Sequence, residues 1–127
     1  MFDHVTIRAS DRRASERFYD LVLRTLGIER THGDEHYFEW GDFSLAQGPP
    51  VTRGLHIAFG APTREHVHVA FPASENETVH AFHRAATAAG YEDNGAPGER
   101  PVYHPGYYGA FVLDPDGNNV EVVNHNR

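Results

Sequence analysis

The stretch that most constrains the fold is residues 109–123 near the C-terminus, which reads GAFVLDPDGNNVEVV. It predicts a strand, a tight turn and a second strand. In the turn, Pro115 presets φ, the Asp114 side chain can accept hydrogen bonds from the backbone ahead of it, and Gly117 tolerates a positive φ. Glu121 lies inside the apolar second strand, where an unpaired charge is costly unless it meets a metal or a partner. Glu121 is therefore a candidate site residue.

Length, charge and cysteine content narrow the class of protein. A chain of 127 residues is one domain by length, and a net charge of −7 disfavours a nucleic-acid partner. The absence of cysteine removes disulfides, thiolate metal sites and cysteine nucleophiles. No apolar run has the length of a membrane span, and the first residues lack the order of a signal peptide. We expect a cytoplasmic protein with no membrane partner.

The first third of the chain predicts a strand, a helix and further strands. Residues 2–8 alternate between two faces, as a strand does. A helix over about 11–26 follows, with Ser10 and Asp11 as candidate N-caps. Gly-Asp pairs then separate three short predicted strands, at 28–32, 35–40 and 43–47. His36, Phe38 and Trp40 share one face of the second of these, which can line a pocket or belong to the core.

Two neighbouring segments repeat one pattern. Residues 55–59 read LHIAF and residues 67–71 read VHVAF. The repeat indicates either two strands of a sheet or a local duplication, and both interpretations stay open. The second segment runs directly into the next predicted helix.

The second predicted helix begins with a capping box, in which Ser74 is followed three residues later by Glu77. Gly90 ends it. Its buried stripe consists of Val79, Phe82, Ala86 and Ala89. A Gly- and Pro-rich loop is predicted over 91–101, and an aromatic, half-exposed segment over 102–108.

Both ends of the chain resemble the vicinal oxygen chelate superfamily, which includes glyoxalase I, fosfomycin resistance enzymes, extradiol dioxygenases and bleomycin resistance proteins. The matching features are the DPDGN turn followed by VE, and the N-terminal FDHVTI strand that opens into a helix. The resemblance implies an α+β fold of two βαβββ modules that form an open, concave mixed sheet. We place the first module at about 1–50 and the second at about 64–127, with 51–63 assigned to neither. The resemblance also implies a homodimer.

Three side chains point away from the apolar faces of their predicted strands: His4, His68 and Glu121. In the barrel that the resemblance implies they meet on the concave face, and the family's role of metal ligand falls on them. Two imidazoles and a carboxylate suit a divalent ion with open positions, such as Zn, Ni, Mn or Fe. His56 competes with His68 because its segment has the same pattern, and His66 shares the face of His68.

The aromatic segment is a second site candidate. Tyr103, His104 and Tyr107 near a metal could orient a substrate or transfer protons, and Glu121 could leave the metal to act as a base. The other interpretation is a loop that packs its rings on the barrel rim. Arg100 beside it either pairs with an anionic substrate or is a solvated loop charge.

Two functional hypotheses follow. The first is a metal-dependent enzyme that chelates two adjacent oxygens of a small substrate, whether as a lyase, isomerase, thiol transferase or oxygenase. The second is a metal-free, bleomycin-resistance-like protein that sequesters an aromatic or cationic drug, which the acidic balance and the Tyr-rich segment would suit. Metal binding discriminates between them.

Overall fold

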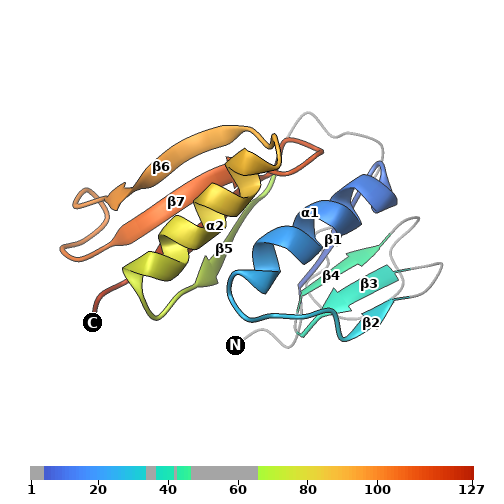
Figure 1. Ribbon diagram of the computed structural model, residues 1–127, viewed down its shortest axis with the longest axis horizontal. Helices are drawn as coiled ribbons and strands as arrows, with labels where there is room; N and C mark the ends of the chain where they lie inside the picture. The colour runs from blue at the N-terminus through green and yellow to red at the C-terminus, as the bar shows by residue number, and fades with distance from the viewer. Residues whose placement is uncertain (1–4, 34–36, 42, 47–65) are drawn as a thin grey trace.

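The computed structural model describes residues 5–33, 37–41, 43–46 and 66–127, and Figure 1 shows two similar halves. The elements of the first half are β1 (Val5–Arg8), α1 (Arg12–Arg24), β2 (His32–Gly33), β3 (Tyr37–Trp40) and β4 (Phe43–Ala46). Those of the second are β5 (His68–Pro72), α2 (Asn76–Ala88), β6 (Asp93–Glu99), β7 (Tyr108–Leu113) and β8 (Asn119–Asn124). This order confirms the predicted α+β class with two βαβββ modules.

The two halves share one sheet topology. The strand orders are β1-β4-β3-β2 and β5-β8-β7-β6, in which β1–β4 and β5–β8 are the parallel pairs. Helices α1 and α2 contact each other and lie on one side of the sheets, in front of them in Figure 1. No described helix covers the opposite sheet faces. Those faces are where polar strand residues can form a site.

The core fills the space between the helices and the sheets. The side chain of Asp11 caps α1 by accepting a hydrogen bond from Ala14 N at 3.1 Å. Both ends of α1 lie within two residues of the bounds predicted from the sequence. The rings of Phe43 in β4 and Phe71 in β5 pack edge to face with centroids 5.3 Å apart, so the core is continuous between the halves. Other core side chains are Phe18, Tyr19, Val22, Phe38, Trp40, Val79, Phe82 and Ala86. Residues 38 and 40 thus belong to the core, and residue 36 lies outside the described part.

The predicted capping box of α2 is wrong. The N-cap is Glu75, and its side chain makes no capping hydrogen bond. Ala73 N still donates to Val123 O at 2.8 Å, so strand pairing continues past β5 and the helix begins only at Asn76. Glu77 forms an ion pair with Arg84 at 2.9 Å instead. Ala89, predicted to be buried, is exposed because the helix ends at Ala88.

Two strand predictions also need correction. The segment predicted as a loop over 91–101 contains β6, which pairs with β7 through register shifts near Gly95 and Gly98. Its position at the edge of the sheet explains why a strand containing Pro97 is tolerated. The strand predicted at 28–32 lies later in the chain, because β2 spans only His32–Gly33.

The predicted C-terminal hairpin is confirmed, and its turn joins the two halves. Asp114 is buried, and its Oδ1 accepts hydrogen bonds from the backbone N of Asp116 and of Asn118, both at 2.9 Å. Its Oδ2 accepts from Tyr19 OH at 2.8 Å and from Asn118 Nδ2 at 2.9 Å. Gly117 adopts the predicted positive φ, at 82°. Because Tyr19 belongs to α1, the turn of the second half is fixed to the helix of the first.

None of the helices in the described ranges is long and apolar enough to cross a membrane.

Replacing Tyr19 with phenylalanine should lower the free energy of unfolding by about 1–3 kcal/mol, because a buried carboxylate oxygen loses a donor. Urea unfolding measures this. The matched control is Tyr91→Phe, since the Tyr91 ring packs against Phe18 and its hydroxyl has no hydrogen bond to a described residue. Equal losses in the two variants would contradict the role given to Asp114.

Candidate functional site

Glu121 is a buried carboxylate in the middle of β8. Its side chain is 2% exposed, and its neighbours Val120 and Val122 belong to the core on the other face of the strand. Its Oε2 lies 2.9 Å from His68 Nε2, and its Oε1 accepts a hydrogen bond from the hydroxyl of Tyr107. The free-energy cost of burying the Glu121 carboxylate is therefore offset by its contacts with two polar side chains.

His68 is the first residue of β5, and the register of β5 with β8 determines which β8 side chains it meets. The parallel pairing puts His68 opposite Asn119 and Ala70 opposite Glu121. Asn119 Nδ2 lies 2.7 Å from His68 Nδ1, so both ring nitrogens have partners on β8. The side chain is half exposed, in contrast to that of Glu121. We call His68, Tyr107, Asn119 and Glu121 the site cluster.

The turn between β6 and β7 presents Tyr107 to Glu121. Arg100 N donates to Tyr107 O at 2.8 Å, and this bond closes the turn. Gly109 leaves the room that the contact needs, since a Cβ there would lie 3.0 Å from Glu121 Oε1 and 3.4 Å from Tyr107 Cε1. Burial, followed by the hydrogen bond to Glu121 and its charge, raises the pKa of Tyr107. Its hydroxyl therefore keeps its proton and acts as a donor.

Tyr103 and His104 flank Tyr107 rather than join the cluster. Tyr103 is 62% exposed, and its ring centroid lies 4.8 Å from that of Tyr107. His104 packs edge to face on Tyr107, while its Nδ1 contacts Pro105 O and its Nε2 contacts His125 Nδ1, both at 2.8 Å. Within the described part of the chain, neither side chain hydrogen-bonds to Glu121 or His68.

The other predicted site residues divide into two groups. His4 and His56 lie outside the described residues. Arg100 Nη2 donates to Ala96 O at 2.7 Å, and its guanidinium lies 5.6 Å from the ring of Phe111, which pairs with Glu121 across the strands. His66 lies by the hairpin turn, where a Cβ on Gly117 would be 3.1 Å from its Nε2.

Of the predicted metal ligands, only His68 and Glu121 lie among the described residues. Among residues 5–33, 37–41, 43–46 and 66–127, no three His, Cys, Asp or Glu side chains are grouped so as to hold a metal ion. His68 and Glu121 are the two members of the predicted set that are described, and their donor atoms face each other.

Sequence reasoning missed Asn119 and Phe111. Both lie beside His68: Asn119 bonds to its Nδ1, and the ring of Phe111 lies 6.1 Å from the imidazole. Strand alternation could have identified Asn119, which stands two residues before Glu121 and so on the same face of β8. No sequence signal identifies Phe111, because its place depends on the pairing of β7 with β8.

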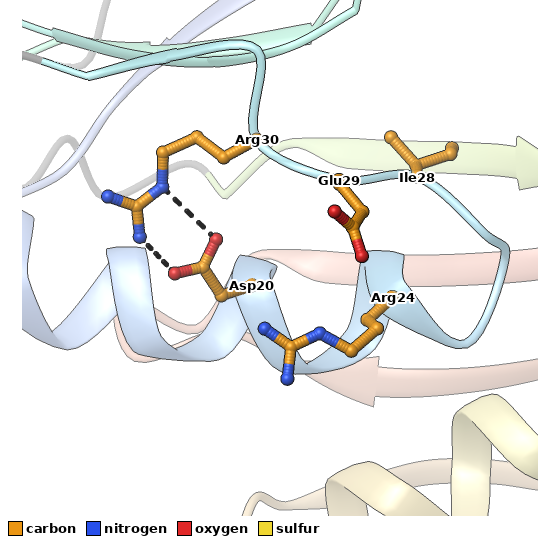
Figure 2. Close-up of a pocket in the computed structure, with 5 residues that line it drawn as sticks. All are labelled: Asp20, Arg24, Ile28, Glu29 and Arg30. Atoms are coloured by element: carbon orange, nitrogen blue, oxygen red, sulfur yellow. Dashed lines mark hydrogen bonds and ion pairs between the residues drawn. The ribbon is translucent and has the colours of Figure 1, made fainter.

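Two hollows on the surface lie apart from the cluster. Figure 2 shows the first, lined by Asp20, Arg24, Ile28, Glu29 and Arg30, with the Arg30 side chain joined to Asp20. Glu16 also pairs with Arg30 at 2.6 Å, so this cation is neutralised within the protein. The second lies between the halves and is lined by Thr25, Leu26, Pro72, Ala73, Ser74 and Thr78.

The family model of the glyoxalase/bleomycin resistance protein/dioxygenase superfamily matches residues 1–122. The chain belongs to this superfamily. The match covers both modules and every residue of the site cluster. A comparison with curated proteins gives no match.

Solved structures of this superfamily have the same fold. A glyoxalase/bleomycin resistance protein from Albidiferax ferrireducens is 28% identical, with a TM-score of 0.69 and 98% of each chain covered. A lactoylglutathione lyase from Agrobacterium tumefaciens is 24% identical, with a TM-score of 0.64 and coverage of 95% of this chain and 91% of the other. The fosfomycin resistance protein FosX from Mesorhizobium loti is 16% identical, with a TM-score of 0.64 and coverage of 98% and 91%. The last two show the fold alone.

Replacing Tyr107 with phenylalanine should lower the free energy of unfolding by about 1.5–3 kcal/mol, because the buried Glu121 carboxylate loses a charge-assisted hydrogen bond. Guanidinium unfolding measures the loss. Tyr103→Phe, in the same turn but exposed, should change it by less than about 0.5 kcal/mol. If both variants unfold at the same denaturant concentration, Tyr107 does not stabilise Glu121.

Proposed function

We propose that this protein is a metal-dependent enzyme that acts on a small oxygen-bearing substrate, with His4, His68 and Glu121 as the metal ligands. The observation that carries the proposal is the approach of His68 Nε2 to Glu121 Oε2 at 2.9 Å, with the carboxylate buried. An imidazole nitrogen and a carboxylate oxygen are donor types that divalent ions such as Zn²⁺ bind, and a bound ion would be held between these two groups. The described pair would supply two of the three proposed ligands.

His68 is favoured over His56 as the second histidine because its imidazole faces Glu121. The ion, when bound, would act as a Lewis acid that stabilises an enolate or alkoxide on the substrate. Whether the reaction is that of a lyase, an isomerase, a thiol transferase or an oxygenase depends on the ion and the substrate. Zn, Ni, Mn and Fe all suit two imidazoles and a carboxylate.

Tyr107 is the proton-bearing group that we assign to the chemistry. Its hydroxyl touches the same carboxylate as His68, and its raised pKa keeps it neutral as a donor. It can thus turn from Glu121 to donate its proton to an oxygen of a substrate bound beside that carboxylate. Tyr103 and His104 would hold the Tyr107 ring in place, and Glu121 would act as the base if it leaves the ion.

A negatively charged substrate is favoured by Arg8 at the end of β1. By strand alternation it lies on the face opposite to the buried Ile7. Arg8 is 8% exposed, and its Nη2 is buried without a hydrogen-bond partner among the described residues. An unpaired guanidinium is costly to bury, so a carboxylate or phosphate oxygen from a substrate would offset that cost.

The alternative is a metal-free protein that sequesters an aromatic or cationic ligand. The exposed ring of Tyr103, which lies 4.8 Å from the ring of Tyr107, favours it, because aromatic faces attract cationic ligands. The homodimer, the cytoplasmic location and the module bounds of about 1–50 and 64–127 are kept as proposals under either function.

The first test is the metal content of protein purified without chelator or affinity tag. We expect about one ion per chain in the wild type, and its loss in His4→Ala, His68→Ala and Glu121→Ala. His56→Ala should retain the ion. So should His83→Ala, the control, whose imidazole pairs with Asp93 away from the cluster. A wild type that takes up no Zn, Ni, Mn or Fe on titration would move the assignment to the sequestering function.

A separate test concerns Arg8. Phosphate or acetate should raise the melting temperature of the wild type and leave that of Arg8→Met unchanged. Without added anion, Arg8→Met should be at least as stable as the wild type, since no unpaired charge is buried. Arg24→Met, an exposed arginine at the end of α1, is the control and should respond to anions like the wild type. An equal response of Arg8→Met would place anion binding elsewhere.

A further inference from the structure

Five polar side chains form one hydrogen-bonded chain through the second sheet. Asn94 Nδ2 in β6 donates to Asn119 Oδ1 at 2.9 Å, and Asn119 Nδ2 lies 2.7 Å from His68 Nδ1. His68 Nε2 then meets Glu121 Oε2 at 2.9 Å, and Tyr107 donates to the other carboxylate oxygen. Because each contact uses one donor and one acceptor, the direction of one bond fixes that of its neighbours.

In this arrangement the imidazole carries its proton on Nε2. The Asn94 amide turns Asn119 Oδ1 toward itself, so Asn119 presents its Nδ2 donor to the ring. His68 Nδ1 must then accept, which leaves Nε2 as the N–H that donates to the carboxylate. The metal-free cluster is therefore satisfied throughout, with a proton between His68 and Glu121.

A cation between the same two groups needs the opposite tautomer. The Nε2 lone pair would face the ion, and Nδ1–H would need an acceptor, which metal-bound histidines almost always have. Asn119 can supply that acceptor by turning its amide over, after which its Nδ2 must donate to Asn94 Oδ1. Asn94 is free to follow, because it is exposed on an edge strand and its side chain bonds to no other described residue.

We propose that Asn119, backed by Asn94, is a positioning residue that sets the tautomer of His68, and that both amides turn over when a cation replaces the proton between His68 and Glu121. This inference rests on the proposed function, since it assumes that His68 and Glu121 bind the ion. The two amides thereby determine how tightly the ion is held, although neither touches it.

Two substitutions should place a hydrogen-bond acceptor against His68 Nδ1, as a bound cation requires. One acts at residue 119 itself, and the other acts on residue 119 from residue 94. Asn119→Asp offers His68 Nδ1 only acceptors, so Nδ1 must carry a proton. Residue 94 bonds to Asn119 rather than to the imidazole, but an acceptor at residue 94 compels Asn119 to turn its Nδ2 toward it and its Oδ1 toward His68. Ala96→Asp adds the same charge to exposed β6 without a hydrogen bond to Asn119 and is the matched control.

The tautomer is read in the metal-free protein by 15N NMR of labelled histidine, with His68→Gln to assign the signal. We expect a proton on Nε2 alone in the wild type and in Ala96→Asp, and a protonated Nδ1 in Asn119→Asp and Asn94→Asp. Titration with Co²⁺ should then give a Kd lower by on the order of 10-fold in both of the latter variants, with no change in Ala96→Asp.

The outcomes separate this inference from the proposed function. An unchanged His68 signal in both Asn119→Asp and Asn94→Asp overturns the inference, even if the wild type binds Co²⁺ normally. An equal gain of affinity in Ala96→Asp also overturns it, because added charge alone would then explain the effect. A tautomer that changes as expected while no variant binds Co²⁺ overturns the metal-dependent function and the coupling to a cation, and leaves Asn119 as the residue that sets the tautomer.

Discussion

The buried contact between Tyr19 and Asp114 is the interaction on which the site depends. It joins α1 of the first half to the turn of the second, where the same carboxylate also accepts two backbone N–H groups and the Asn118 amide. This turn sets where β8 begins, and β8 carries both Asn119 and Glu121. The position of the cluster is therefore determined by a carboxylate that takes no part in it.

The hairpin contains two buried carboxylates whose surroundings differ. Asp114 has donors on both oxygens, all of them from backbone, amide or phenol groups that keep their protons. Glu121 instead faces Tyr107 and the imidazole of His68, whose two ring nitrogens can exchange the roles of donor and acceptor. The first carboxylate is suited to a fixed structure, and the second to the exchange of proton for cation that we propose.

Local pattern predicted the fold where each segment's own chemistry decided its structure. The hairpin, α1 and most of the buried stripe of α2 follow from turn residues and helical spacing. The strand β6 did not, because its glycines and Pro97 are tolerated only by virtue of its place at the sheet edge. Glu121 was identifiable from its apolar neighbours. The difference between Tyr103 and Tyr107 was not, since only tertiary contact brings one hydroxyl to Glu121.

The parallel register of β5 with β8 limits how this chain can vary. His68 meets polar side chains because it stands opposite Asn119, two residues before Glu121. Inserting or deleting one residue in the turn at 114–118 would shift β8 by one position and turn valines toward His68, because side chains alternate along a strand. Homologues that keep the site must therefore keep the length of this turn, whereas the edge strand β6 can lengthen or shorten without moving the cluster's two β8 residues.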